Sequence, residues 1–315
     1  MRLVFCGTPR FAVPTLEALI AAQHEIALVV SQPDRPVGRT QQLTAPPVKQ
    51  TALAVGLEIT QPEKIKNNFE FRARIEAIAP DAIVVVAYGR IIPPWMLALP
   101  RSGCINLHAS LLPKYRGAAP IQWAVAMGEA VTGNTTMLLE EGLDTGPILL
   151  QREVPIRPAQ TAADLFDVLA HDGALLMIET LAGLKNGTIT PKPQDHARAT
   201  LAPLLTREDG LMDFDRYTAN ELINRWRGFQ PWPGAYTMFK GKKLIVHRMK
   251  VMAPAIDVPV DFAPATVFAD DQRMLVVSAQ RTWLEFIEVQ LEGKKRISAA
   301  DFLHGHIHAA GMRLG

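Results

Sequence analysis

The first 190 residues alternate short apolar runs with helix-like segments, and this alternation restricts the possible folds more than any other feature of the chain. The apolar runs have the length of buried strands and are rich in β-branched and aliphatic residues; they cover residues 3–6, 26–30, 82–86 and 104–108. The segments around Leu16 and at residues 48–55 and 69–78 fit helices. Strands that alternate with helices usually pair in parallel, with helices on both faces of the sheet. We therefore expect an α/β domain with a mostly parallel sheet.

The pattern changes after residue 206, which indicates a second domain. One helix is predicted at residues 219–227, opening at Thr218. Short strand-like runs follow, separated by turn residues, at 236–239, 243–249, 266–268, 275–278 and 283–289. This spacing favours a small antiparallel barrel or sandwich. Since 315 residues exceed one typical core, we predict a first domain at 1–188, a proline-rich linker at 189–206 and a second domain at 207–315.

Composition and cysteine content narrow the class of protein. Charged residues make up 20% and the net charge is +2, as in an ordinary globular chain. Cys6 and Cys104 lie in separate apolar runs, so we expect buried free thiols in a reducing compartment. No apolar run is long enough to cross a bilayer and no signal sequence precedes the first strand. We expect a cytoplasmic monomer with no membrane partner.

Histidines alternate near the C-terminus at 304, 306 and 308, a spacing that can bind a metal ion. Because no carboxylate or cysteine joins them, and because no other cysteine or histidine spacing fits a zinc site, we expect no metal.

Two segments carry basic residues that could bind a negatively charged partner. Residues 33–47 hold four prolines together with Arg35 and Arg39, and a loop of this length is usually functional or disordered. In the second domain, five basic residues fall within eleven positions without an acidic residue: Lys240, Lys242, Lys243, Arg248 and Lys250. They fit solvated strand faces and turns, and they equally fit a surface that contacts a phosphate backbone.

Three side chains offer acyl-group chemistry. Asn106 and His108 are two positions apart, so in a strand they project from the same face. An asparagine amide can donate to an oxygen that gains charge in a tetrahedral intermediate, and a histidine can move a proton near neutral pH. Asp144, in the turn Gly-Leu-Asp-Thr-Gly, can orient that imidazole. No nucleophile is required if the substrate supplies an amine, which indicates direct acyl transfer.

Spacing alone also fits a purely structural role, in which Asn106 and His108 are a polar strand end and Asp144 fixes a turn. The context favours a site, because open α/β sheets bind ligands at the carboxyl ends of their central strands. Absent motifs exclude other chemistry. The chain has no glycine-rich phosphate loop and no Gly-x-Ser-x-Gly turn, which disfavours a tightly held dinucleotide or ATP and a serine hydrolase.

Asn-x-His followed by Ser-Leu-Leu-Pro-x-x-Arg-Gly, with Gly-Leu-Asp-Thr-Gly downstream, resembles the folate-dependent formyltransferases. The similarity runs nearly end to end, and the loop at 33–47 and the C-terminal domain resemble those of the members whose acceptor is methionyl initiator tRNA. It implies a Rossmann-like formyltransferase domain and a C-terminal β-barrel like an oligonucleotide-binding fold. The reaction it implies moves the formyl group of 10-formyltetrahydrofolate, a co-substrate, to the α-amino group of that tRNA, with catalysis by Asn106, His108 and Asp144.

The same resemblance assigns binding residues. It places the folate beside Ser110, Leu111, Leu112 and Pro113 and near Val86, Tyr88 and Gly89. It assigns tRNA contacts to Arg35 and Arg39 in the loop and to the five basic residues at 240–250. Two departures from the family are visible. Thr40-Gln41-Gln42 stand where glycine and lysines are common, which lowers the charge of the loop, and Asn134 replaces a usual valine.

Two alternatives remain from the sequence. One is an enzyme that formylates an amino sugar or hydrolyses the formyl-folate. The other is a tRNA-binding protein with a vestigial transferase site.

Overall fold

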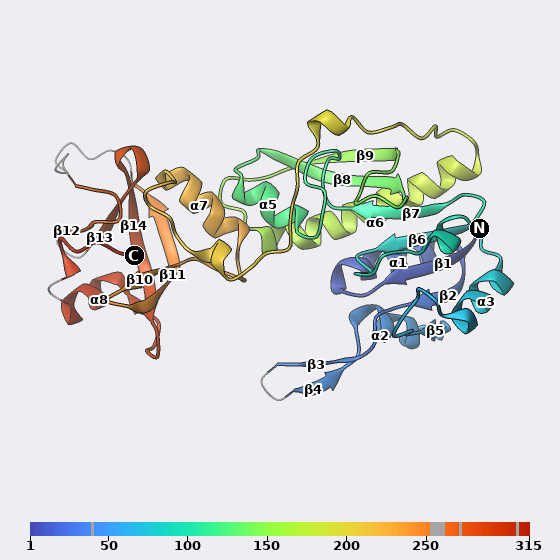
Figure 1. Cartoon of the computed structure of the whole chain (residues 1–315), viewed down its shortest axis with the longest axis horizontal. Coiled ribbons are helices and arrows are strands. Elements are labelled where there is room, and N and C mark those ends of the chain that lie inside the picture. Colours follow the sequence, from blue (N-terminus) through green and yellow to red (C-terminus); the bar gives the residue numbers. More distant parts are fainter. Residues whose placement is uncertain (39–40, 253–261, 271–272, 307–308) are drawn as a thin grey trace. The chain divides into compact units, whose positions relative to one another are not determined.

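The computed structural model describes residues 1–38, 41–252, 262–270, 273–306 and 309–315 (Figure 1). The chain forms two compact units. The first consists of Met1–Pro120, Val131–Ile156 and Asp164–Pro203, and the second of Ile121–Ala130, Arg157–Ala163 and Leu204–Gly315. No helix in these described ranges has both the length and the apolar character needed to cross a membrane.

The first unit contains a seven-stranded sheet with the order β5-β2-β1-β6-β7-β8-β9. Its strands are β1 (Arg2–Gly7), β2 (Glu25–Val30), β5 (Ile59–Thr60), β6 (Ala82–Val86), β7 (Cys104–His108), β8 (Val131–Leu138) and β9 (Ile148–Pro155). The five strands from β5 to β7 pair in parallel, and β8 and β9 add to the β7 edge as antiparallel strands. The predicted α/β class and mostly parallel sheet are therefore confirmed.

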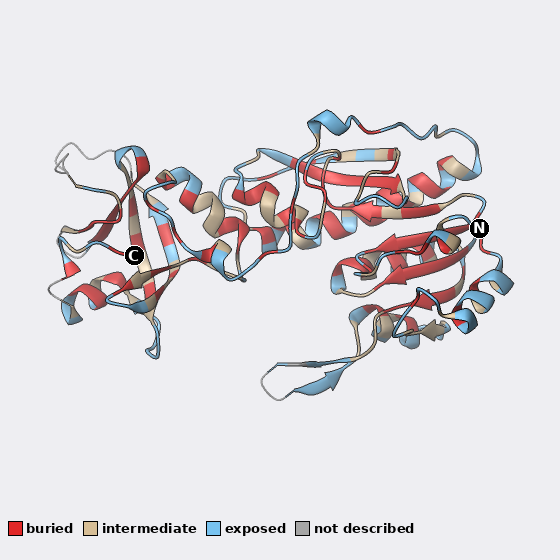
Figure 2. Ribbon diagram, in the orientation of Figure 1, coloured by how far each residue is buried: buried red, intermediate tan, exposed pale blue. Residues whose placement is uncertain are grey.

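Helices connect and cover these strands. They are α1 (Val13–Ala21), α2 (Pro47–Ala54), α3 (Phe69–Ile78), the short α4 (Pro94–Leu97) and α6 (Ala162–Lys185). The longest, α6, packs on β7 and β8: the Cβ position of Gly173 would lie 2.7 Å from Leu107, and Thr180 hydrogen-bonds Thr136 at 2.7 Å. Because β1 and β6 are covered on both faces, they are almost entirely buried, as the red strands in Figure 2 show.

The sequence prediction did not include the hairpin formed by β8 and β9. The buried stretch of β8 runs from Thr132 to Met137, and every residue in it except Met137 is polar or glycine. This stretch carries no apolar periodicity, and the side chains of Asn134, Thr135 and Thr136 are buried with hydrogen-bond partners on neighbouring elements. Polar burial of this kind is invisible to an analysis based on apolar runs.

The loop predicted at 33–47 contains a small antiparallel hairpin, β3 (Arg35–Val37) and β4 (Gln42–Thr44), which is largely exposed (Figure 2). Its base is fixed to the sheet unit by polar contacts. The Lys49 ammonium lies 2.8 Å from the Asp34 carboxylate, which also accepts a hydrogen bond from Gln61.

The second unit contains an antiparallel sheet with the order β10-β11-β14-β13-β12, and β15 pairs with β14. Its strands are β10 (Tyr236–Phe239), β11 (Lys242–Val251), β12 (Val267–Asp270), β13 (Arg273–Ser278), β14 (Thr282–Leu291) and β15 (Ile297–Ser298). Its helices are α5 (Pro120–Ala126, almost all in this unit), α7 (Ala219–Gly228) and α8 (Ala299–Gly305). Thr218 and Glu221 form a capping box at the start of α7, where the helix was predicted to open.

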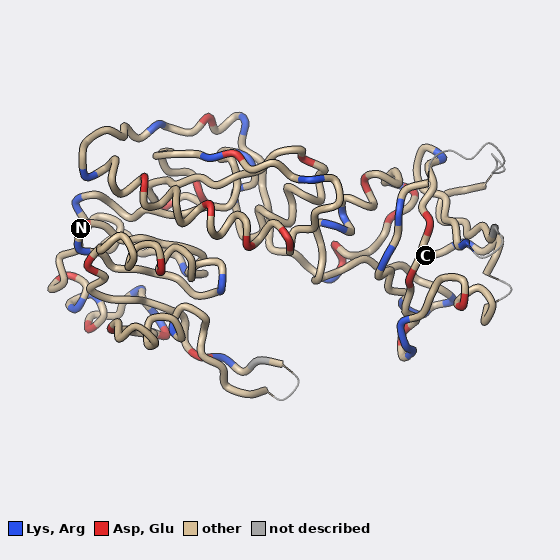
Figure 3. The backbone as a smooth tube through the Cα atoms, turned by 180° about the vertical axis from the view of Figure 1, so that it is seen from behind, with Lys and Arg blue, Asp and Glu red and all other residues tan. Residues whose placement is uncertain are grey.

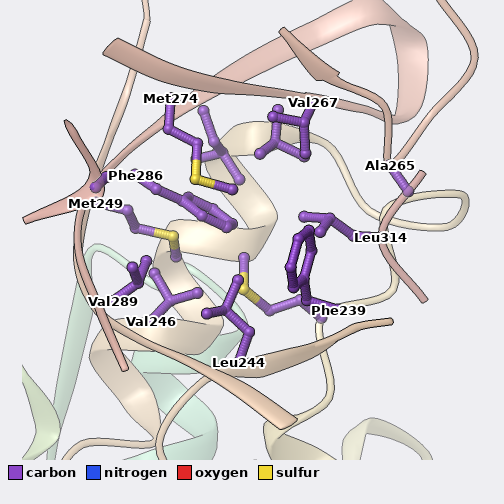
Figure 4. Packing of buried hydrophobic residues seen from close by; sticks show 14 of the residues in the cluster. Phe239, Leu244, Val246, Met249, Ala265, Val267, Met274, Phe286, Val289 and Leu314 are labelled. Carbon is purple, nitrogen blue, oxygen red and sulfur yellow. The ribbon is translucent and has the colours of Figure 1, made fainter. Parts of the chain in front are cut away.

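The sheet of the second unit curls around an apolar core, which confirms the predicted small β-barrel-like domain. Phe239, Val246, Met274 and Phe286 converge in this core (Figure 4). The C-terminal tail links the two edges of the curl, because Leu314 N donates to Ala265 O and Gly315 N donates to Met238 O on β10.

Candidate active site

The candidate catalytic residues Asn106 and His108 lie on β7, which is flanked by β6 and β8. Asn106 is opposite Val85 on β6, and His108 is opposite Thr135 on β8. His108 ends the strand and is 6% exposed, while Asn106 is half-buried. The polar residues thus stand toward the carboxyl end of a central strand, the usual ligand position in an open α/β sheet.

Hydrogen bonding determines which nitrogen of His108 can exchange a proton. Nε2 lies 2.9 Å from the Tyr115 carbonyl oxygen, which can only accept, so Nε2 carries a hydrogen. Nδ1 lies 3.7 Å from Asp144 Oδ2, and both side chains are largely buried. Proton exchange is therefore confined to Nδ1, the nitrogen that faces the carboxylate.

Asp144 is held in a tight loop between β8 and β9. Its φ of 50° is in the left-handed region, which is unfavourable for a residue other than glycine. The Gly117 backbone N–H donates to Oδ2 at 2.8 Å, and the Asp144 carbonyl accepts from Gln194 at 2.8 Å. Gly146 is required for the loop, because a Cβ there would lie 1.9 Å from the Leu138 carbonyl oxygen.

The Asn106 amide has no hydrogen-bond partner among the residues that the structure describes. Its two N–H groups are thus available to a substrate oxygen. Together, Asn106, His108 and Asp144 provide a hydrogen-bond donor, a proton-exchanging nitrogen and a negative charge. None of these three residues is a nucleophile.

The segment Ser110–Pro113 follows β7 and is held by hydrogen bonds to Thr135 on β8. The Thr135 hydroxyl donates to Ser110 O at 2.6 Å and accepts from Leu112 N and Gln151 Nε2 at 3.1 and 2.9 Å. The Leu112–Pro113 peptide bond is cis. The Ser110 hydroxyl donates to the Lys114 carbonyl, so it serves the loop itself. Leu111 and Pro113 are half-buried and could contact a ligand.

The second predicted folate segment follows β6. The side chains of Val86 and Tyr88 are buried, and burial raises the pKa of the Tyr88 hydroxyl, which has no partner among described residues. A ligand could reach the backbone here more readily than these side chains. Gln32 donates to the carbonyls of Tyr88 and Gly89 at 3.1 Å. Gly89 has a φ of 77°, a conformation that favours glycine.

The basic residues predicted to contact tRNA are separated in the chain. Arg35 lies exposed on β3, with Glu63 at 3.7 Å, and Arg39 lies outside the described residues. The remaining five lie on β11 and the turn before it: Lys240, Lys242, Lys243, Arg248 and Lys250. Figure 3 shows lysines and arginines of the C-terminal unit in blue.

An irregularity in β11 decides which of these residues share a face. The pairing of β11 with β14 shifts register on both sides of Arg248. Before the shift, Leu244 and Val246 are buried; after it, Met249 is buried, so the inward positions change from even to odd. As a result Lys243 and Arg248 both project outward, which a regular strand would not allow. Lys250 also projects outward and pairs with Glu285 at 3.0 Å.

The histidines near the C-terminus make no metal site in the described part of the chain, which contains no group of three possible ligands. His306 donates through Nδ1 to the Phe302 carbonyl and stacks on its ring, while His308 lies outside the described residues.

The departure at Asn134 has a visible consequence in the structure. Its amide donates to Leu169 O and to Asp172 on α6 at 2.9 and 3.0 Å, so a polar tie joins β8 to that helix. The Asn134 side chain is therefore committed to α6 and takes no part in the contacts of His108.

Sequence analysis missed two residues that contact the Asp144 loop or its surroundings. Gln194 lies in the segment predicted as a linker, and Arg116 in the motif after Pro113 was given no role. Both side chains are less than 10% exposed. A glutamine among prolines gives no periodic signal, so only the folded contacts identify it.

Comparison with known proteins supports a transferase. Residues 1–181 match the family described as formyl transferase, and residues 204–307 match its C-terminal domain. The chain is 65% identical over 315 residues to a methionyl-tRNA formyltransferase of Acidobacterium capsulatum, covering 100% of both chains. It is 56% identical to the one of Koribacter versatilis, over 100% of this chain and 99% of the relative.

Solved structures share the fold at low sequence identity. WlaRD, a sugar 3N-formyl transferase, superposes with a TM-score of 0.65 at 16% identity, over 94% of this chain and 99% of that one. HypX of Aquifex aeolicus in complex with tetrahydrofolic acid gives 0.58 at 16% identity, over 98% of this chain and 48% of that one.

Proposed function

The chain belongs to the formyl transferase family, and we propose that it transfers the formyl group of 10-formyltetrahydrofolate to the α-amino group of methionyl initiator tRNA. One observation supports this chemistry. His108 lies on the same strand as Asn106, and its Nδ1 atom faces the Asp144 carboxylate. The choice of acceptor is supported by the full-length identity of 65% to a methionyl-tRNA formyltransferase.

The reaction we propose is a direct attack of the amine on the formyl carbon. A bond forms between the methionyl nitrogen and that carbon, and the formyl oxygen gains negative charge. The bond from the carbon to N10 of the folate then breaks, and N10 takes up a proton while the amine loses one. The Asn106 amide donates to the charged oxygen, because preorganised donors stabilise such intermediates.

His108 and Asp144 manage the protons and the charge. Since Nε2 is committed to Tyr115, Nδ1 donates to the developing oxyanion or carries the proton between amine and folate. The Asp144 carboxylate stabilises the imidazolium form by its charge at 3.7 Å. Asn106 fixes the formyl oxygen, so Asn106 and His108 bracket the reacting carbon.

We assign the folate to the segment Ser110–Pro113 and to the backbone after β6, and the tRNA to Arg35, Arg39 and the basic face of β11. These assignments follow from the positions of both folate segments at the carboxyl ends of β6 and β7 and from the positive charge of the exposed groups. We likewise propose a catalytic domain at 1–188, a linker at 189–206 and a tRNA-binding domain at 207–315, acting as a monomer in the cytoplasm.

Acceptor competition tests this proposal. The enzyme is given 10-formyltetrahydrofolate with methionyl initiator tRNA, with a nucleotide-linked amino sugar, or with no acceptor. We expect formyl-methionyl-tRNA to form at least about 100-fold faster than formyl-sugar or free formate, because a site built for one acceptor leaves polar groups unpaired with another. Faster sugar formylation, or formate release that tRNA does not suppress, would replace this function by one of the two other enzymatic activities. Binding of tRNA with no folate-dependent product would indicate a vestigial site.

A further inference from the structure

The segment between the two predicted domains is packed on the first unit, across two loops of the candidate active site. Its backbone pairs with both: Lys192 bridges to Ile148 after the Asp144 loop, and Leu201 bridges to Arg116. The Thr200 hydroxyl accepts from Tyr115 N at 2.9 Å. We call residues 192–202 the strap.

One buried side chain of the strap contacts Asp144 itself. Gln194 is 6% exposed, and its amide nitrogen donates to the carbonyls of Asp144 and Gly146, both at 2.8 Å. Its amide oxygen accepts from Arg116 Nε and Nη2 at 3.1 and 2.6 Å. Both donor hydrogens and both acceptor lone pairs of the side chain are therefore used.

This arrangement ties the two loops that define His108. The loop at 115–117 supplies the Tyr115 carbonyl that holds Nε2 and the Gly117 N–H that holds the Asp144 carboxylate. Gln194 joins the Arg116 side chain of that loop to the backbone of Asp144. The distance between Nδ1 and Oδ2 is consequently set from both sides, at the side chain and at the backbone of Asp144.

Asp144 needs such support because its backbone is strained. Asp144 has a φ of 50°, and a residue other than glycine persists in this left-handed region only where its surroundings impose it. Gln194 holds this stretch of backbone with two hydrogen bonds, one to the carbonyl of Asp144 and one to the carbonyl of Gly146.

We propose that Gln194, held by Arg116, is a positioning residue for the formyl transfer, which keeps the Asp144 carboxylate at the Nδ1 atom of His108. The inference deepens the proposed function and rests on it. It assigns a role in turnover to a segment that the sequence presents as a connection between domains. A misplacement of about 1 Å in such a group can cost on the order of 100-fold in rate.

Two nearly isosteric substitutions test the proposal in the full-length enzyme. Gln194→Glu keeps the bonds to Arg116 but turns an acceptor toward the two carbonyls, and Gln194→Met removes all four bonds without adding charge. We expect kcat to fall on the order of 10- to 100-fold in each, with KM for folate and for tRNA within about 3-fold. Gln194→Met carries the test if the charge in Gln194→Glu prevents folding.

The matched control is Asp195→Ala, on the same strap. Asp195 caps the short helical turn at His196–Arg198 by accepting from Ala197 N at 3.1 Å, and makes no hydrogen bond to Asp144. This variant should lose stability, as loss of a cap does, with kcat within about 2-fold of the parent. Equal losses of kcat in Asp195→Ala and in the Gln194 variants would contradict a positioning role and indicate general loosening of the strap.

A double-mutant cycle with Asp144→Asn separates positioning from stability. If Gln194 acts through the Asp144 carboxylate, its substitution should change kcat less than about 3-fold once that charge is gone. Additive losses would overturn the inference, as would an unchanged kcat in the Gln194 single variants. Full turnover in Asp144→Asn alone would instead refute the proposed function of Asp144, which is a separate result.

Discussion

Replacement of Asp144 by asparagine removes the carboxylate charge and keeps its shape. The amide oxygen of the new side chain can still accept from Gly117 N, and the Gln194 bonds to the backbone do not depend on the side chain. The change is therefore nearly confined to the electrostatic interaction with His108, across 3.7 Å between largely buried groups.

The size of that interaction follows from Coulomb's law. At an effective dielectric constant of about 20, unit charges at this distance attract by about 4 kcal/mol. Each step of about 1.4 kcal/mol corresponds to roughly a factor of ten in rate. If the imidazolium form is present in the transition state, Asp144→Asn should lower kcat by roughly 1000-fold.

Single-turnover formylation with saturating folate and tRNA measures this loss directly, and tRNA binding is measured separately by filter retention. We expect the dissociation constant for tRNA to stay within about 2-fold, because the Asp144 carboxylate is largely buried and already held by Gly117 N beside His108. A loss of kcat smaller than about 10-fold, or a loss of binding that matches the loss of rate, would refute the electrostatic role.

Three further predictions concern the folate loop, the thiols and the basic face. Thr135→Val removes three hydrogen bonds that hold Ser110–Pro113, so it should raise KM for folate about tenfold and lower the free energy of unfolding by about 1–3 kcal/mol. The control is Thr132→Val, which removes a buried hydroxyl without a partner among described residues. It should leave thermal stability unchanged or raise it. Burial raises the pKa of Cys104 to about 12 and that of Cys6 well above its usual value, so both thiols should resist a thiol reagent at about pH 8 until the protein unfolds, and fast labelling of the folded enzyme would contradict their burial. Arg248→Gln should weaken tRNA binding and lower the slope of log affinity against log salt by about 1, and an unchanged slope would exclude a phosphate contact there.

The sequence predicted the fold where burial is apolar. The four strands at 3–6, 26–30, 82–86 and 104–108 are recovered as β1, β2, β6 and β7, because each is a continuous apolar run inside a covered sheet. The apolar pattern did not predict strand β8, since five of its six buried residues are threonines, a glycine and an asparagine, and several of their polar groups bond to neighbouring elements.

The geometry of the site depended on contacts that a sequence does not display. The spacing of Asn106 and His108 placed them on one face, and the structure brings Asp144 to His108. The orientation of the imidazole, however, comes from the backbone carbonyl of Tyr115, and any residue at that position has a carbonyl. The role of Gln194 likewise depends on chain segments 50 residues apart meeting at one loop.

The register of β11 also depends on contacts that the sequence does not show. Alternation along a regular strand would place Lys243 and Arg248 on opposite faces, and the shift around Arg248 reverses this. A bulge depends on pairing with β14, so its position follows from the partner strand as well as from the local residues.

Transfer of an isotopically labelled formyl group tests the central claim most directly. 10-Formyltetrahydrofolate labelled with ¹³C at the formyl carbon is incubated with the enzyme and with methionyl initiator tRNA or methionyl elongator tRNA, and the aminoacyl products are analysed by mass spectrometry. We expect ¹³C on the α-amino group of methionine from the initiator tRNA, much less of it with the elongator tRNA, and none in His108→Ala. Label recovered only as formate, or no label on methionine from folded enzyme beside an active control formyltransferase, would contradict it.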